Sequence, residues 1–284
     1  MACEQPVSTP SITEFAPAKI NLSLHVGLKQ ADGFHPIDSQ VAFADFGDRL
    51  YFQSASNICL KLRGPFAECV PTGEGNLVIK AARLLAQTTG ISEPGVRITL
   101  EKTMPVASGI GGGSADAAAT LRGLNQLWKL ALPLPELANI GAKLGSDIPA
   151  CVYASDLRMR GRGEQIELLP PCPSKIGVLV NPGIQLSTGA VFAKFDQLAP
   201  EKTDARKQNS LTNAAIQLAP EIGDLLAVLN QLDPLQPAQM CGSGATCLAF
   251  FADRKSAEQV AKDLLQLHPR WWVQPVKIGL QSVD

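Results

Sequence analysis

The chain has 284 residues, 45% of them hydrophobic, which is enough to form the core of one large domain or two ordinary ones. Its 25 Lys and Arg residues nearly balance its 26 Asp and Glu residues. This balance argues against duplex nucleic acid or an anionic membrane as a partner, because either would require an extended basic surface. We therefore expect any phosphorylated ligand to be held by a local site.

The cysteines and the N-terminal residues indicate a cytoplasmic protein. The seven cysteines are odd in number and show no C-x-x-C spacing, so a disulfide framework or a zinc knuckle is not expected. The first eleven residues carry no Lys or Arg, and no apolar run reaches the roughly 18 residues of a membrane span. We expect buried or tolerated thiols in a reducing cytosol, and no membrane partner.

The first half of the chain shows both strand and helix patterns. Residues 19–26 alternate strictly between polar and apolar side chains, which predicts a half-buried strand with Lys19 and Asn21 on its polar face. The patterns that follow predict a helix over 76–88, a strand over 96–101, and helices over 114–128 and 135–144.

The second half mixes strands and helices without regular alternation. It predicts strands over 165–169, 176–180, 247–251 and 272–276, and helices over 211–218, 221–232 and 256–266. This irregular order favours an α+β fold over a doubly wound sheet. We expect two domains, residues 1–156 and residues 157–284.

A glycine-rich loop lies between a predicted strand and a predicted helix. Glycines let the backbone approach a ligand, and the helix N-terminus directs N–H groups into the loop, so the segment predicts a phosphate site. A tight turn is the simpler alternative. The loop has neither a Walker A sequence nor a Rossmann fingerprint. We interpret Asp116, in the first helical turn, as complementing the helix dipole rather than binding metal. The loop residues are Pro105, Val106, Ala107, Ser108, Gly109, Ile110, Gly111, Gly112, Gly113 and Ser114.

This loop resembles the phosphate loop of the GHMP kinases, and other segments resemble the diphosphocytidyl-methylerythritol kinase branch of that superfamily. The matching segments keep the family's order between about residues 14 and 252: Ala16–Leu22, Asp32–Ser39, Gly145–Pro149, Gly161–Glu164, Asn181–Ile184 with Ser187 and Thr188, and Gly242–Thr246.

The resemblance implies a two-lobed α+β GHMP kinase fold. Residues 1–156 are expected to form an ATP-binding lobe like the second domain of ribosomal protein S5, and residues 157–284 a ferredoxin-like, substrate-side lobe. The implied reaction is ATP-dependent phosphorylation of the 2-hydroxyl of a cytidyl-diphosphate sugar alcohol, in non-mevalonate isoprenoid synthesis. The implied cofactor is ATP with Mg²⁺, and no metal site on the protein is expected. We expect a monomer or weak dimer.

The resemblance also implies roles for individual side chains. Asp147 matches the catalytic base, although an Asx-turn or N-cap is the structural alternative. Lys19 is expected beside it, although alone it reads as an ordinary exposed lysine. The loop residues, with Asn76 and Lys102, are expected to bind ATP, and Asn76 reads equally well as a helix N-cap. The expected substrate-binding residues are Asn21, Phe34, His35, Thr188, Phe192, Gly242, Ser243 and Gly244.

The chain departs from the family pattern at several positions. Phe34 stands where Tyr is usual, and Ala107 and Ser108 replace a more glycine-rich opening of the loop. Two rival functions remain open: another GHMP kinase acting on homoserine or a mevalonate derivative, and a catalytically dead sensor on the same fold. Phe34, His35 and Phe192 argue against the first, because those substrates have no base to sandwich. The presence of both Lys19 and Asp147 argues against the second.

Overall fold

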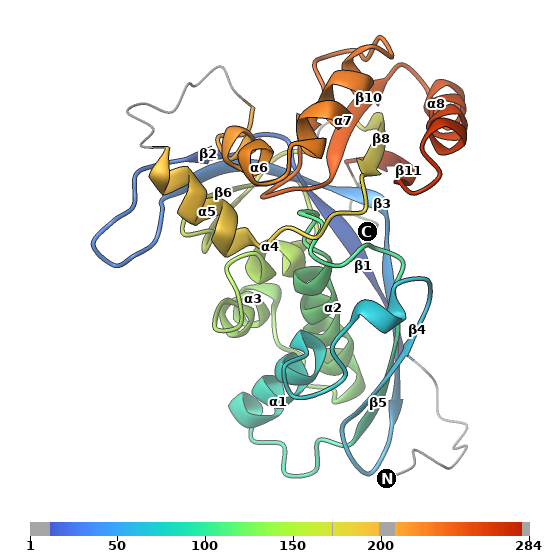
Figure 1. Cartoon of the computed structure of the whole chain (residues 1–284). Helices are drawn as coiled ribbons and strands as arrows, with labels where there is room; N and C mark the ends of the chain where they lie inside the picture. The colour runs from blue at the N-terminus through green and yellow to red at the C-terminus, as the bar shows by residue number, and fades with distance from the viewer. Residues whose placement is uncertain (1–11, 172, 199–207, 280–284) are drawn as a thin grey trace. The chain divides into compact units, whose positions relative to one another are not determined.

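The computed structural model describes residues 12–171, 173–198 and 208–279, which form two compact units (Figure 1). The first unit contains Gly47–Val106 and Gly112–Tyr153 together with strand residues up to Ala18. The second contains Lys19–Phe46, Ala107–Gly111 and the described residues from Ala154 onward. The domain boundary expected after residue 156 divides the chain once, whereas the chain passes between these units several times.

Two of these passages lie within strands that run from one unit into the other. Strand β1 (Ile12–Asn21) leaves the first unit after Ala18, and β3 (Ile37–Ser54) enters it at Gly47. A Cβ built on Gly47 would lie 2.1 Å from the Ala16 carbonyl oxygen, so the two strands approach more closely there than a side chain permits. Lys19 and the glycine loop therefore lie close to positions at which the chain passes from one unit to the other.

The first unit packs four helices beside a small sheet. Strand β5 (Val96–Glu101) pairs antiparallel with β3 and parallel with β4 (Cys59–Arg63). Helix α2 (Gly112–Leu127) contacts the other three helices, which are α1 (Leu77–Thr89), α3 (Leu134–Ala142) and α4 (Ile148–Tyr153); the 3-10 turn η1 (Ala67–Cys69) follows β4. A Cβ on Gly123 would lie 2.4 Å from the Phe52 ring, so this glycine lets α2 pack closely on β3.

The second unit is built on an antiparallel sheet. Strand β8 (Lys175–Asn181) lies between β10 (Cys247–Phe251) and β11 (Trp272–Ile278), and β9 (Gln239–Met240) pairs with β10. The first part of β3 pairs with β2 (His25–Val26), β6 (Leu157–Gly161) and β11, while β7 (Gln165–Leu168) pairs with β6. The helices of this unit are α5 (Thr188–Gln197), α6 (Thr212–Leu218), α7 (Glu221–Asn230) and α8 (Arg254–Leu267).

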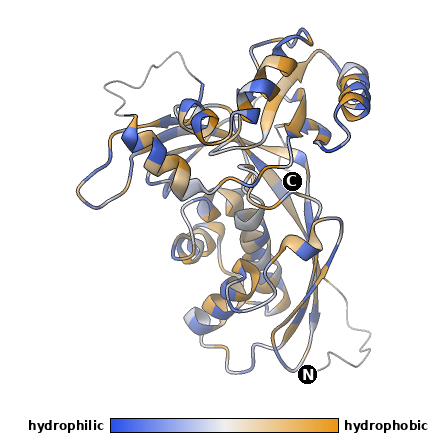
Figure 2. Ribbon diagram, in the orientation of Figure 1, coloured by the Kyte–Doolittle hydropathy of each residue, from blue (hydrophilic) through white to orange (hydrophobic). Residues whose placement is uncertain are grey.

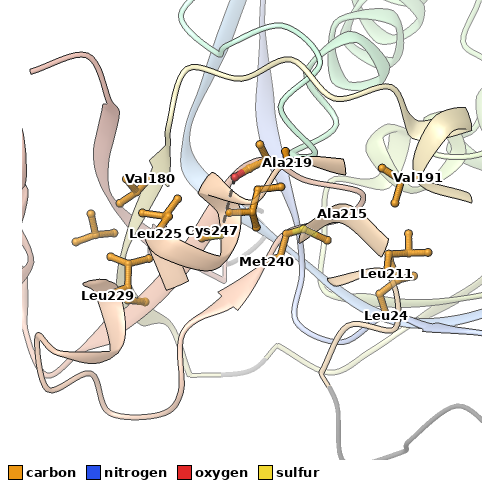
Figure 3. Packing of buried hydrophobic residues seen from close by; sticks show 14 of the residues in the cluster. Leu24, Val180, Val191, Leu211, Ala215, Ala219, Leu225, Leu229, Met240 and Cys247 are labelled. Carbon is orange, nitrogen blue, oxygen red and sulfur yellow. Dashed lines mark hydrogen bonds between the residues drawn. The ribbon is translucent and has the colours of Figure 1, made fainter. Parts of the chain in front are cut away.

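The core of the second unit joins helices to sheet through aliphatic side chains. Leu225 and Leu229 of α7 belong to the same buried cluster as Val180 of β8 and Cys247 of β10 (Figure 3). Hydrophilic and hydrophobic residues alternate along α8, which buries only Ala257, Ala261 and Leu264 (Figure 2). This amphipathic pattern is what made α8 predictable from the sequence.

Most predicted elements are present, and the α+β prediction is confirmed. The single strand predicted over 19–26 is wrong, because β1 ends at Asn21 and β2 begins at His25. The elements that were not predicted include the strands β3, β4, β6 and β9 and the helices α4 and α5. None of the helices in the described part of the chain is long and apolar enough to cross a membrane.

The expectation that the cysteines are free thiols holds only in part. Cys151, Cys241 and Cys247 are buried and Cys69 is exposed, and these four side chains form no disulfide. Burial raises the pKa of Cys241 to about 12, so this thiol is inert near neutral pH. Cys59 is disulfide-bonded, contrary to the expectation of free thiols. Cys3 and Cys172 lie outside the described residues.

Candidate functional site

The middle of the glycine-rich loop, Ala107–Gly111, belongs to the second unit, where Gly109 lies against the loop of residues 241–244. A Cβ on Gly109 would lie 2.5 Å from the Cys241 carbonyl oxygen and 2.7 Å from that of Gly244. The φ angle of Gly109 is +80°, in the left-handed region. The Thr246 backbone N–H also donates to the Ser108 carbonyl oxygen at 3.1 Å. Two loops that the sequence assigned to different ligands are therefore packed backbone against backbone.

Lys19 lies beside the next glycine of this loop. A Cβ on Gly111 would lie 3.0 Å from the Cβ and 3.3 Å from the Cε of Lys19, and Gly111 has a φ of +69°. The Lys19 backbone N–H donates to the Ile110 carbonyl oxygen at 2.9 Å. Only 3% of Lys19 is exposed, so the interpretation of an ordinary exposed lysine is wrong. Ala107 takes a φ of +53°, so the alanine in this departure from the family pattern adopts a conformation that glycine favours.

Asn21 presents a buried acceptor close to Gly242. Its Nδ2 donates to the Ser39 hydroxyl at 2.7 Å, while its Oδ1 is buried without a hydrogen-bond partner among the described residues. This Oδ1 lies 3.5 Å from a Cβ built on Gly242. An unpaired buried acceptor costs about 1–3 kcal/mol, so a ligand hydroxyl placed there would bind favourably.

Three further hydrogen bonds hold the 241–244 loop and the residue before it. The Ser243 and Thr188 hydroxyls lie 2.9 Å apart, so two predicted substrate-binding residues meet. The buried Asn209 side chain donates to the carbonyl oxygens of Met240 and Gly242, both at 2.8 Å. No sequence pattern singled out Asn209, because its partners are backbone groups far along the chain.

His35 is held by hydrogen bonds on both ring nitrogens. Nδ1 lies 3.0 Å from the Gly27 carbonyl oxygen, and Nε2 lies 3.1 Å from the Asp196 carboxylate. The Phe192 ring packs against the imidazole, with a centroid distance of 5.2 Å. The predicted neighbours His35 and Phe192 are therefore brought together. Asp196 was missed, although its place one helical turn after Phe192 on α5 is the signal that could have identified it.

Phe34 differs from His35 in being 52% exposed. The Arg162 guanidinium carbon lies 4.9 Å from the centroid of its ring, a cation–π geometry that orients the ring without burying it. Exposed aromatic rings of this kind can stack on a nucleobase. Arg162 belongs to the Gly161–Glu164 segment that matches the kinase branch, which the sequence had not connected with Phe34.

The glycine loop ends in the first unit, above a buried ion cluster. The Lys102 ammonium lies 2.6 Å from the Asp48 carboxylate and 2.7 Å from that of Asp116, and 3.1 Å from a Cβ built on Gly112. All three charged side chains are at most 5% exposed. The interpretation of Asp116 as a simple complement to the helix dipole is therefore incomplete, because its main partner is Lys102.

Burial and neighbouring charges shift the pKa values of Asp116 and Lys102. Burial, together with the neighbouring Asp48 carboxylate, raises the pKa of Asp116 to about 8, although Lys102 opposes the shift. Burial by itself lowers the pKa of Lys102, but the Asp116 and Asp48 carboxylates outweigh it and raise that pKa. Asp48 also accepts hydrogen bonds from the backbone N–H groups of Thr103 and Met104. The Lys102 ammonium is thus committed to internal partners.

Two further residues that were predicted to bind ATP, Asn76 and Gly113, have different surroundings. Asn76 is the N-cap of α1: its Oδ1 accepts from the Val78 N–H at 2.8 Å, and its Nδ2 donates to the Pro71 carbonyl oxygen at 2.6 Å. The N-cap interpretation is confirmed, while a role in binding ATP stays a prediction. A Cβ on Gly113 would meet only Leu77, at 3.4 Å, so this glycine has more room around it than Gly109 or Gly111.

Asp147 immediately precedes helix α4. Its carbonyl oxygen accepts a hydrogen bond from the Cys151 N–H at 3.2 Å, as an N-cap residue does, and its side chain is half-buried. The N-cap role, which was the structural alternative for Asp147, is thus filled by its backbone carbonyl group. It does not exclude chemistry, because an N-cap carbonyl leaves the carboxylate of the same residue able to act on a ligand.

Comparison with known proteins settles the family. A model described as GHMP kinases N terminal domain matches residues 76–155, and one described as GHMP kinases C terminal matches residues 192–269. These matches cover more than half of the chain. The chain belongs to the GHMP kinase family. It has the α+β fold of that family, as the sequence predicted.

Within the GHMP kinases, two similar proteins and one similar crystal structure are named for the same cytidyl substrate. The chain is 42% identical to the 4-diphosphocytidyl-2-C-methyl-D-erythritol kinase of Paramagnetospirillum magneticum, with 93% of this chain and 97% of the relative covered. It is 45% identical to the kinase of that name from Ruegeria pomeroyi, covering 92% and 97%. A crystal structure of 4-(cytidine 5'-diphospho)-2C-methyl-D-erythritol kinase superposes with a TM-score of 0.77 at 29% identity, covering 95% of this chain and 100% of that one.

Proposed function

We propose that this GHMP kinase transfers the γ-phosphoryl group of ATP to the 2-hydroxyl of 4-diphosphocytidyl-2-C-methyl-D-erythritol, a step of non-mevalonate isoprenoid synthesis. The observation that carries the proposal is full-length similarity, at 42–45% identity, to kinases named for this substrate. The second unit supports it with an exposed Phe34, a fixed His35 and a buried Asn21 oxygen that has no hydrogen-bond partner in the described part of the chain. A monomer or weak dimer and a cytoplasmic location stay predictions of the sequence.

The nucleotide is assigned to the C-terminal end of the glycine loop, at Gly112 and Gly113. Gly113 leaves room for a phosphate to approach the backbone, and α2 begins at Gly112, so its first N–H groups are available to an anion. Lys102 is less suited to this role than the sequence suggested, because its ammonium is already paired with the buried side chains of Asp48 and Asp116. We assign Lys102 to the support of α2 rather than to direct contact with ATP.

The residues fit a magnesium ion carried by ATP better than one held by the protein. Among the described residues, no group of three or more His, Cys, Asp or Glu side chains could hold a metal. The Oδ1 of Asp116, which has no hydrogen-bond partner among the described residues, is a poor ligand, because the Lys102 ammonium lies 2.7 Å from the same side-chain carboxyl group and would repel a cation. When bound with ATP, Mg²⁺ neutralises phosphate charge and remains largely hydrated.

Phosphoryl transfer needs a group that orients or deprotonates the hydroxyl and cations that stabilise the moving charge. We assign the first role to the Asp147 carboxylate and the second to the buried Lys19 ammonium. Asn21 Oδ1 is assigned to a hydroxyl of the substrate. Both nitrogens of the His35 ring have internal partners, so hydrogen bonds that select cytosine fall to the backbone around Phe34 and His35.

Substrate choice and the role of Asp147 can be tested in one assay. We expect ATP-dependent ADP release with the cytidyl substrate and little with homoserine or mevalonate. Asp147→Asn should lower kcat by about 10²–10⁴-fold while ATP binding and the melting temperature stay near those of the parent. Ser146→Ala, at the exposed neighbouring position, is the matched control and should keep normal turnover. Near-normal turnover of Asp147→Asn would reduce Asp147 to its capping role.

A further inference from the structure

Arg122 connects three elements of the first unit from the middle of α2. Its side chain is only 15% exposed. Nε donates to the Glu14 carboxylate at 2.9 Å, and Nη2 donates to the Phe15 carbonyl oxygen at 2.8 Å, both on β1. Nη1 donates to the carbonyl oxygens of Cys151 and Val152, at 2.8 and 3.3 Å, both on α4. One guanidinium thus donates to four acceptors, and no sequence pattern had connected any of them with Arg122.

The contact with α4 is chemically specific. Cys151 and Val152 lie in the last turn of α4, where carbonyl oxygens have no partner within the helix. A cation at this end also interacts favourably with the helix dipole. The planar guanidinium reaches the carbonyls and Glu14 together because its donors point in fixed directions, whereas a lysine ammonium is a single point charge.

Helix α4 is the element on which Asp147 depends. Asp147 directly precedes Ile148, and its carbonyl oxygen receives the Cys151 N–H, so one helical turn separates Asp147 from a carbonyl that Arg122 holds. At the start of the helix, a Cβ on Gly141 would lie 2.6 Å from Ile148 Cγ2, so α3 packs tightly there. Helix α4 is therefore held at both of its ends.

We propose that Arg122 is a positioning residue for phosphoryl transfer, which fixes α4 against α2 and thereby sets the place of the Asp147 carboxylate. This inference rests on the proposed role of Asp147. It links the helix that starts at the glycine loop with the helix that starts at the base, inside one unit of the molecule. Misplacement of a reacting group by about 1 Å can lower a rate by about 10²-fold.

The test is a double-mutant cycle between Arg122→Gln and Asp147→Asn. We expect Arg122→Gln to lower kcat by about 10–100-fold while the KM for ATP changes by less than about threefold. In the Asp147→Asn background, Arg122→Gln should lower kcat by less than about threefold, because the group it positions is already absent. Arg122→Lys should restore little of the loss, since it cannot serve β1 and α4 together.

Two control variants separate positioning from stability. Glu14→Gln removes the charged partner of Arg122 but leaves the carbonyl contacts with α4, so it should lower the melting temperature and leave kcat near that of the parent. Gln126→Ala removes a neighbouring α2 side chain that donates to Glu14 at 2.6 Å, and should leave both quantities near normal. All kinetics are measured well below the melting temperature of each variant.

The outcomes distinguish failure of the inference from failure of the proposed function. If the parent does not phosphorylate the cytidyl substrate, the proposed function fails, and the cycle is measured on whichever of homoserine or mevalonate the parent does phosphorylate. Unchanged kcat in Arg122→Gln, or losses that multiply fully with Asp147→Asn, would overturn the role of Arg122 on any of these substrates. A loss of kcat in Glu14→Gln equal to that in Arg122→Gln would overturn it as well.

Discussion

The two ends of the glycine-rich loop look alike in sequence and lie in different surroundings. At the first end, Gly109 and Gly111 belong to the second unit and have positive φ angles. Their missing side chains make room for protein atoms: the backbone of residues 241–244 and the side chain of Lys19. At the second end, Gly112 and Gly113 begin α2 in the first unit, above the Lys102 ion cluster.

This difference teaches that one motif contains glycines of two kinds. Glycines at the first end are required by the packing of the protein itself, whatever the loop binds. Gly113 is not required in this way, since a Cβ there would meet only Leu77. A glycine that packing does not demand is the better candidate for a position that a phosphate approaches. Substitutions at the two ends should therefore separate folding from nucleotide binding.

The largest effect on stability is expected from Lys102→Met, below the second end. It leaves the Asp48 and Asp116 carboxylates buried without their cation, which typically costs about 3–5 kcal/mol. Denaturant unfolding measures this loss. Lys61→Met, an exposed lysine of β4, is the matched control and should change stability by less than about 0.5 kcal/mol. A stable Lys102→Met that has lost ATP binding would return Lys102 to the nucleotide site.

A smaller loss is expected from Gly109→Ala, at the first end. The new Cβ would meet backbone atoms at 2.5–2.8 Å and would hold alanine at a positive φ. Strain and overpacking together should cost about 2–4 kcal/mol. Gly73→Ala is the control, because nothing lies within 4 Å of its built Cβ. Equal unfolding free energies for the two variants would contradict the packing role of Gly109.

The smallest effect on stability is expected from Gly113→Ala. Alanine fits beside Leu77 and suits a helix, so the free energy of unfolding should change by about 0.5 kcal/mol or less. ATP affinity should nevertheless fall by about tenfold or more, because a methyl group would stand where a phosphate approaches the backbone. ATP titration beside a thermal melt measures both quantities. Unchanged affinity would remove the distinction between the two ends of the loop.

Elements with a periodic pattern of apolar residues were predicted from the sequence, whereas the strand that carries Asp48 was not. The helices α1, α2 and α8 and the strand β5 were found because their apolar residues repeat at the period of one element. Strand β3 was missed because Val41–Ala44 are buried in succession and Asp48 interrupts the later part with a fully buried charge. The short helix α4 carries Pro149 and spans only Ile148–Tyr153, too short for a periodic pattern.

The candidate residues show the same limit. Lys19, Asn21, His35 and Asp147 were identified by resemblance, which records which side chains recur in a family but not what each one touches. The role of Lys102 could not be read from the sequence, because its partner Asp48 lies 54 residues away and charged residues are usually exposed. Asp196, Asn209 and Arg122 were missed for a related reason, since each acts through partners that are distant in sequence or belong to the backbone.

The sequence by itself determined the α+β class, the glycine loop at the start of a helix, and the kinase family, because these depend on the order and spacing of residues along one segment. Only the tertiary structure decided that the chain passes repeatedly between two units, that Lys19 and Asn21 are buried, and that Lys102 is paired with the buried side chains of Asp48 and Asp116. The physical reason is that burial and ion pairing depend on which distant segments meet. The free energy of a charged or polar group depends on those neighbours far more than on the residues beside it in the chain.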